Sequence, residues 1–86
     1  MVEIRVLGAG CARCKELEKI CFNVAAENNI DADIQKITDI KEIMSYGIMQ
    51  TPGLVINGKV KISGKLPTAS TILHWMQEGS KEKESI

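Results

Sequence analysis

The sequence has few aromatic residues and no excess of charge of either sign. Each of these features excludes some classes of protein. One Phe, one Tyr and one Trp occur in 86 residues, so we expect an aliphatic core. The 11 basic residues are balanced by 11 acidic residues. This balance argues against nucleic acid and membrane partners, because both favour a basic surface. No apolar run approaches the roughly 20 residues of a membrane-spanning helix.

The sequence also has too few cysteines for a disulfide-stabilised scaffold. Its three cysteines allow only one bridge. Cys11 and Cys14 are separated by two residues, and a bridge between them would close a loop too short to constrain the unfolded chain much. The first ten residues lack the basic and apolar segments of a signal peptide. We therefore expect a cytoplasmic protein in which this cysteine pair serves chemistry rather than stability.

The apolar pattern of this single small domain predicts four strands and three helices. The strands are expected at residues 2–7, 30–37, 53–56 and 59–62. The helices are expected at residues 11–28, 39–47 and 68–78. The polar segment 80–86 is expected to be a disordered charged tail, which leaves residues 1–79 as the domain.

The element order β-α-β-α-β-β-α predicts an α/β fold with a four-stranded mixed sheet and three helices. A β-α-β beginning needs a crossover and therefore a parallel pair of strands, whereas the Asn57-Gly58 turn adds an antiparallel hairpin. Asp39, with Glu42 three residues later, is expected to cap the second helix. Thr68 is expected to begin the third helix and Gly79 to end it.

Several residues near the second helix are predicted to serve packing. Ile40, Ile43 and Met44 share its apolar stripe. For Met49, packing within its loop is favoured over a place beside a substrate groove. For Tyr46, packing at the helix end and approach to the cysteines both stay open.

Cys11 and Cys14 stand where a strand gives way to a helix, a position that favours thiol–disulfide exchange. The free N–H groups and the dipole of a helix N-terminus stabilise a thiolate, and Arg13 adds a nearby positive charge. Cys14, one turn further along, can attack a mixed disulfide formed on Cys11. The pattern predicts Cys11 as the nucleophile and Cys14 as the resolving thiol.

Two other uses of the same pair stay open, namely a soft-metal site and an inert pair. A closed zinc site is not expected, because it needs four ligands and the single histidine, His74, lies on the last helix. A two-coordinate Cu(I) site would make the chain a metal-transfer module. Small copper carriers end on a strand, whereas this chain is predicted to end on a helix.

The third cysteine is predicted to be a buried small hydrophobic residue. Cys21 follows Cys14 by seven positions, which places the two Cα atoms about 10 Å apart on a continuous helix. A disulfide needs a separation below about 7 Å. Cys21 therefore belongs to the apolar face of the helix rather than to the redox chemistry.

The stretch from Tyr46 to Val60 resembles the matching region of thioredoxins. There, as here, a Tyr-Gly-Ile run leads to a proline, an apolar strand and an Asn-Gly hairpin. The C-x-x-C pair that opens the first helix matches as well, so the resemblance covers about residues 2–78. It is closest to the short, glutaredoxin-sized thioredoxin-like proteins called small redox-active disulfide proteins. The resemblance implies a thioredoxin-like fold and protein disulfide oxidoreductase activity.

By position, the resemblance implies roles for the residues around the pair. Pro52 would be the cis-proline facing the cysteines, and Thr51 would offer its backbone to an extended substrate as one rung of a β-ladder. Arg13 would complete the substrate-binding set. No metal and no cofactor beyond the Cys11–Cys14 disulfide are implied. A module that only binds peptides along the Thr51-Pro52 edge is a further alternative.

The resemblance also implies a set of partners. The substrates would be disulfide-containing proteins. This chain would reduce them as a monomer and would thereby take part in electron transport. Its own electrons would come from a flavoprotein resembling thioredoxin reductase or from a small thiol.

The sequence departs from thioredoxins beside the cysteines. Gly8-Ala9-Gly10 stands where thioredoxins carry a tryptophan, and Ala12-Arg13 replaces Gly-Pro between the two cysteines. We identify no counterpart of the buried thioredoxin aspartate in the second strand.

Overall fold

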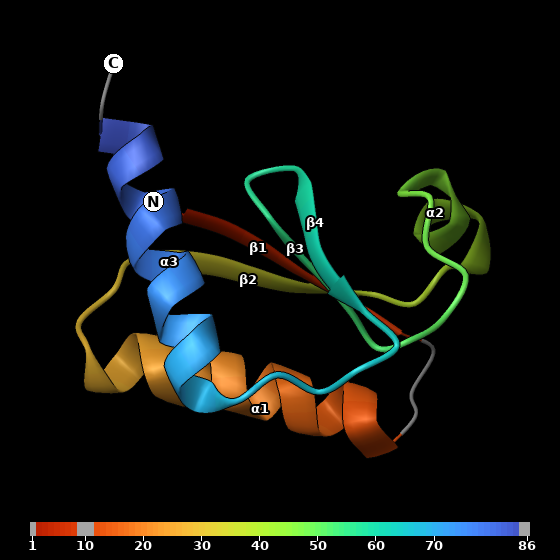
Figure 1. Ribbon diagram of the computed structural model, residues 1–86, viewed down its shortest axis with the longest axis horizontal. Helices are drawn as coiled ribbons and strands as arrows, with labels where there is room; N and C mark the ends of the chain where they lie inside the picture. The colour runs from red at the N-terminus through yellow and green to blue at the C-terminus, as the bar shows by residue number, and fades with distance from the viewer. Residues whose placement is uncertain (1, 9–11, 85–86) are drawn as a thin grey trace.

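The computed structural model describes residues 2–8 and 12–84, with side chains described as far as Lys81. Its elements follow the predicted order (Figure 1). They are β1 (Val2–Leu7), α1 (Ala12–Glu27), β2 (Ala32–Ile37), α2 (Ile40–Ser45), β3 (Gly53–Ile56), β4 (Lys59–Ser63) and α3 (Ala69–Glu84). Within these ranges no helix has both the length and the apolar character needed to cross a membrane. The predicted α/β architecture is confirmed.

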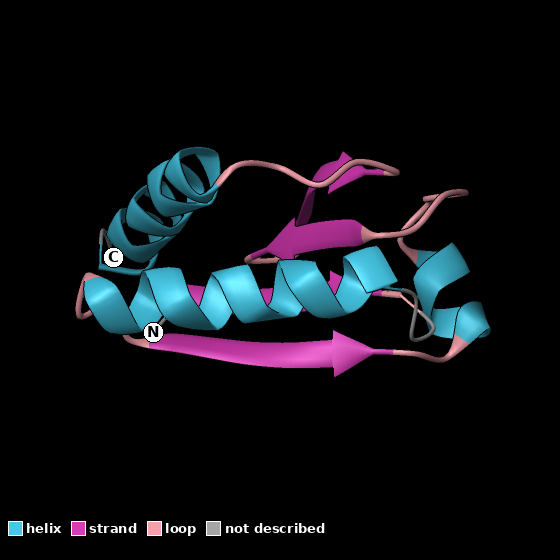
Figure 2. Ribbon diagram, turned by 90° about the horizontal axis from the view of Figure 1, so that it is seen from below, coloured by secondary structure: helices cyan, strands magenta, loops and turns pink. Residues whose placement is uncertain are grey.

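The four strands form one mixed sheet in the order β2-β1-β3-β4. β1 pairs with β2 in parallel, and β3 pairs antiparallel with both β1 and β4. Helix α1 runs along the sheet (Figure 2) and, with α3, covers the face on which the alternate β1 residues Val2, Ile4 and Val6 are buried. α2 packs on the opposite face at one end of the sheet, where Ile43 meets Leu7.

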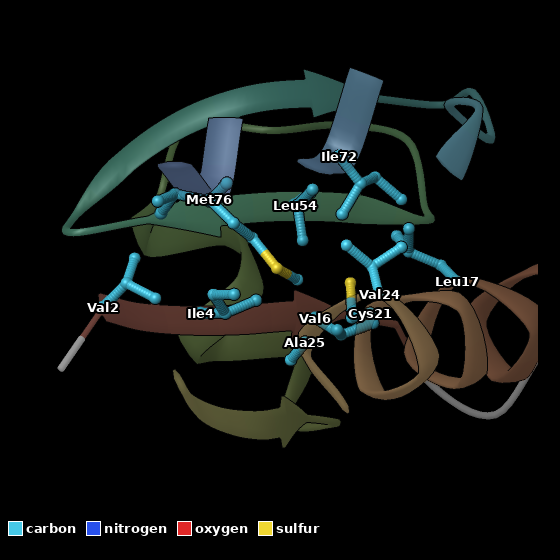
Figure 3. Packing of buried hydrophobic residues seen from close by; sticks show 11 residues of the cluster. Val2, Ile4, Val6, Leu17, Cys21, Val24, Ala25, Leu54, Ile72 and Met76 are labelled. Carbon is cyan, nitrogen blue, oxygen red and sulfur yellow. The ribbon is translucent and has the colours of Figure 1, made fainter. Parts of the chain in front are cut away.

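The main core is aliphatic, as the scarcity of aromatic residues predicted. Figure 3 shows side chains of β1, α1, β3 and α3 meeting in one cluster. Its fully buried members include Ile4, Leu17, Leu54, Ile72 and Met76. Burying a side chain of this size stabilises the fold by about 1.5–3 kcal/mol relative to leaving it exposed. Leu17 lies one turn after Cys14 on α1. Both residues therefore belong to the side of this helix that faces the sheet.

The smaller cluster on the opposite face holds α2 through one residue. Its buried members are Leu7, Ile43, Ile48 and Val55. Of the predicted stripe of α2, Ile43 is buried, whereas Ile40 and Met44 are 63% and 67% exposed. Only one residue of the predicted apolar stripe is therefore covered, because this short helix lies at the end of the sheet.

The predicted caps set the helix boundaries. The Asp39 side chain accepts a hydrogen bond from the backbone N–H of Lys41 at 3.0 Å, and Gly47, at φ +83°, follows the last turn of α2. The Thr68 hydroxyl accepts from the N–H of Thr71 at 3.3 Å at the start of α3. These bonds occupy backbone donors that a helix start leaves without partners.

The predicted end of α3 at Gly79 is wrong. The helix continues to Glu84, so residues 80–84 are helical where a disordered tail was expected, and 85–86 lie outside the described residues. A Cβ at Gly79 would lie 2.8 Å from Val2 Cγ2 and 2.9 Å from Ile56 Cγ2. The glycine thus permits a close approach of the helix to the sheet instead of ending the helix.

Asn57 ties this region to the β3–β4 turn. It adopts φ +51° and Gly58 φ +82°, the left-handed pair typical of a two-residue hairpin. The Asn57 side chain also accepts from the N–H of Glu3 at 2.9 Å and donates to the Gly79 carbonyl at 2.9 Å. One residue therefore joins β1, the hairpin and α3.

Candidate redox site

Cys14 is the cysteine of the C-x-x-C pair that the structure describes, and it lies in the first turn of α1. Cys14 is fully buried and is disulfide-bonded. Its inward orientation confirms the prediction from helical spacing. Cys11, predicted as the nucleophile, lies outside the described residues. Arg13, between them in sequence, is exposed on α1.

Gly8 makes room for Cys14 because glycine has no side chain. Gly8 follows β1, is buried, and donates its N–H to the Ile37 carbonyl at 3.0 Å. A Cβ at Gly8 would collide with Cys14 Sγ and lie 2.8 Å from Cys14 Cβ. Sequence reasoning treated this glycine only as the end of a strand. The signal was its place directly before the cysteine segment, but its contact partner follows from the packing of α1 on β1.

The loop before β3 reaches the same point. The hypothetical Gly8 Cβ would lie 3.9 Å from Thr51 Cβ. The C-terminal end of β1, the first turn of α1 and the loop before β3 therefore converge at one end of the sheet (Figure 1). The structure brings Cys14 and Thr51, which are 37 positions apart in the sequence, to within 4 Å of one point beside Gly8.

The Thr51–Pro52 peptide bond is cis, the geometry that the resemblance implies. Thr51 is exposed, whereas Pro52 is buried. The Pro52 carbonyl accepts from the N–H of Gly64 at 2.8 Å, which ties the loop to the end of β4. Thr51 is therefore exposed at the surface on a loop that is tied to β4 directly after it.

Neither a buried charge nor a cluster of metal ligands accompanies Cys14 in the described part of the chain. No charged or polar side chain is buried among the residues that the structure describes, in line with the failure to find the thioredoxin aspartate in the sequence. The same residues contain no group of three or more His, Cys, Asp or Glu side chains placed to hold a metal ion.

Cys21 behaves as predicted. Its thiol is free and fully buried in the main core, among the side chains shown in Figure 3. Burial raises its pKa to about 12, and the charge of Glu18 adds to the rise. The thiol is therefore protonated at neutral pH and unreactive.

A groove opens beside Thr51. It has a volume of about 380 Å³ and is lined by Ile40, Ile43, Met44, Ile48, Met49 and Thr51. Met49 is 98% exposed, so the favoured packing role for this residue is wrong, whereas Tyr46 packs against the smaller cluster. The sequence placed Ile40 and Met44 on a helix face but did not show that the sheet ends before it can cover them.

Comparison with known proteins gives one consistent result. A family model described as "Thioredoxin domain" matches residues 2–77. A thioredoxin of Methanothermobacter thermautotrophicus is 36% identical over 72 residues, which cover 84% of this chain and 94% of that protein. A thioredoxin of Methanocaldococcus jannaschii is 35% identical over 72 residues, which cover 84% of this chain and 83% of that protein. With its βαβαββα order, mixed sheet and disulfide-bonded Cys14, the chain belongs to the thioredoxin domain family.

Proposed function

We propose that the chain is a thiol–disulfide oxidoreductase that exchanges electrons with protein disulfides through Cys11 and Cys14. One observation carries the proposal. Cys14, in the first turn of α1, is disulfide-bonded and buried directly beside Gly8, next to the exposed Thr51. We infer that its bridge is to Cys11, the other cysteine of the C-x-x-C pair. The proposal also agrees with the family of the chain.

The reaction proceeds in two exchanges. The Cys11 thiolate attacks one sulfur of a partner disulfide, forms a mixed disulfide and releases the partner's other sulfur as a thiolate. Cys14 then loses its proton and attacks the Cys11 sulfur, which forms the Cys11–Cys14 bond and releases the second partner sulfur. Two electrons pass to the partner, and both of its sulfurs become thiols after protonation. Burial shields Cys14 from other disulfides, so it reacts only with its neighbour.

Thr51 and Pro52 position the partner. Thr51 is exposed and adjoins the Cys14 region, so its backbone can pair with an extended segment carrying the attacked disulfide. Arg13, exposed in the same first turn as Cys14, adds positive charge at the site of thiolate formation.

The dithiol is regenerated by an external donor. A flavoprotein resembling thioredoxin reductase, or a small thiol, would reduce the Cys11–Cys14 bond. In this proposal the protein acts as a cytoplasmic monomer with no cofactor beyond its own disulfide.

A redox titration run beside a metal titration tests the proposal. We expect a two-electron couple, with a tenfold change in the ratio of dithiol to disulfide for each ~30 mV. We also expect the dithiol to reduce insulin disulfides. A dithiol that binds Cu(I) stoichiometrically but reduces no disulfide would support the metal-transfer alternative. A Cys11→Ser and Cys14→Ser double variant is the control for both titrations.

A further inference from the structure

The groove beside Thr51 has an unusual share of exposed sulfur. Met44 on α2 and Met49 in the following loop are 67% and 98% exposed, and both line it. The other described methionine, Met76, is fully buried in the main core. The exposed thioethers of the described residues are therefore confined to this groove.

The groove is placed to receive part of a disulfide partner. Thr51 belongs both to its lining and to the proposed redox site. A partner segment that pairs with the Thr51 backbone would therefore lie against one wall of the groove. No charged side chain lines it, so the fitting occupant is an apolar side chain of that segment. Flexible methionine side chains suit such a surface, because they adapt to apolar groups of different shape.

Methionine adds a chemical property that the neighbouring isoleucines lack. A thioether is oxidised to a sulfoxide, which turns a flexible apolar side chain into a polar one and disrupts methionine-rich interfaces. Exposure controls which methionines react, and Met49 has almost no protection.

We propose that Met44 and Met49 are a modification site at which hydroperoxides switch off the docking of protein disulfides while leaving the cysteine chemistry intact. The inference rests on the proposed function and adds regulation to the same site. In the reaction, peroxide transfers one oxygen atom to the methionine sulfur. The O–O bond breaks, an S=O bond forms, the sulfur loses two electrons, and hydrogen peroxide is reduced to water. Methionine sulfoxide reductases reverse the change.

The rest of the chain should survive the same treatment. Cys14 is already in a disulfide, and the Cys21 thiol is buried with a raised pKa, so neither presents an exposed thiolate to peroxide. Treating the disulfide form therefore isolates the methionines.

The experiment compares the full chain with a Met44→Leu and Met49→Leu variant. Each is treated in its disulfide form with hydrogen peroxide and freed of peroxide by catalase. The substrates are insulin and the small disulfide 5,5′-dithiobis(2-nitrobenzoate). Insulin reduction is then assayed with dithiothreitol as the electron donor. The small disulfide is instead mixed with protein that has been reduced and freed of dithiothreitol, because dithiothreitol would reduce it directly. Leucine keeps the groove apolar but cannot be oxidised, and the variant retains Met1 and Met76.

We expect treatment to lower kcat/KM for insulin about tenfold in the parent chain, the scale of losing one good apolar contact. Treatment should leave the activity of the parent chain with the small disulfide unchanged, and it should change neither activity of the variant relative to the untreated variant. Methionine sulfoxide reductases should restore insulin reduction. Peptide mass spectrometry should show sulfoxide at Met44 and Met49 before Met76.

Other results would contradict the inference. Equal loss of insulin reduction in parent and variant, unchanged insulin reduction after both methionines are oxidised, or oxidation of Met76 as early as Met49 would each overturn it. Failure of the untreated chain to reduce either disulfide would instead contradict the proposed function on which the inference depends.

Discussion

At the scale of single residues, the site depends on a side chain that is absent. Cys14 occupies the space where a Gly8 side chain would stand, since a Cβ there would collide with Cys14 Sγ. No left-handed φ is recorded at Gly8, so the requirement is one of space and not of backbone conformation. The stretch before the cysteines therefore needs glycine at this position for Cys14 to be buried.

A Gly8→Ala substitution should consequently destabilise the protein. We expect a loss of about 1–3 kcal/mol, the usual cost of forcing an extra group into a packed core. The loss should be smaller when Gly8→Ala is made in a Cys14→Ala background, because Sγ is then absent. Urea unfolding of the four proteins gives this coupling directly. An equal loss in both backgrounds would show that Gly8 acts through something other than Cys14.

Cys21 provides a stability test with a defined pH dependence. Burial raises its pKa from the ordinary value of about 9.0 to about 12, so the folded state holds the proton more tightly. This contribution is fully present below about pH 9 and is lost as the pH rises toward 12, by about 1.4 kcal/mol per pH unit at most. We expect the stability of the parent, in its disulfide form, to fall more steeply than that of Cys21→Ala between about pH 8 and pH 10.

The same variant separates packing from chemistry. At neutral pH, Cys21→Ala should lose about 1–2 kcal/mol of stability through trimming a buried side chain, and its disulfide turnover should stay near that of the parent. A folded Cys21→Ala protein with tenfold lower turnover would give this thiol a part in the reaction. Equal pH slopes for the two proteins would contradict the burial of an uncharged thiol.

At this scale, the sequence predicted residues whose role follows from local spacing. Cys14 and Cys21 were assigned to the buried face of α1 because a helix repeats every 3.6 residues. The roles of Gly8 and Met49 were not predicted, because they depend on which distant segments pack against them. No local pattern shows that β1 ends under Cys14 or that the sheet stops short of Met49.

At the scale of elements, Asn57 is a junction as well as a turn residue. Its side chain accepts a hydrogen bond from the Glu3 N–H in β1 and donates one to the Gly79 carbonyl in α3. Asn57→Gly keeps the left-handed turn but removes both side-chain bonds, whereas Asn57→Ala also places a β-carbon at φ +51°.

We expect Asn57→Gly to cost about 1–3 kcal/mol, from two lost hydrogen bonds. Asn57→Ala should cost about 1 kcal/mol more, because alanine is strained in the left-handed region. Thermal or urea unfolding measures both. An Asn57→Gly protein as stable as the parent would show that the residue serves the turn alone.

The element boundaries show where local signals fail. The caps Asp39 and Thr68 were predicted because side-chain oxygens bond to the nearest backbone donors. Gly79 was misread as a helix end because glycine is common there. Its actual role is to let α3 approach Val2 and Ile56, and that requirement arises from tertiary packing.

At the scale of the whole molecule, the fold follows from element order more than from any one motif. The β-α-β beginning and the Asn57-Gly58 hairpin together predicted a mixed four-stranded sheet, and the structure has one. The placing of β1 between β2 and β3 is what joins the cysteine segment to the Thr51 loop. Two sequence segments that are far apart thereby form one candidate site.

The central claim is that Cys11 attacks a partner disulfide and Cys14 resolves it. The most direct test is to trap the mixed disulfide in a Cys21→Ala background and map it by peptide mass spectrometry. Cys14→Ser should accumulate a partner bonded to Cys11, because the resolving thiol is gone. Cys11→Ser should trap nothing and reduce no insulin. A partner bonded to Cys14, or full turnover with either serine variant, would contradict the account.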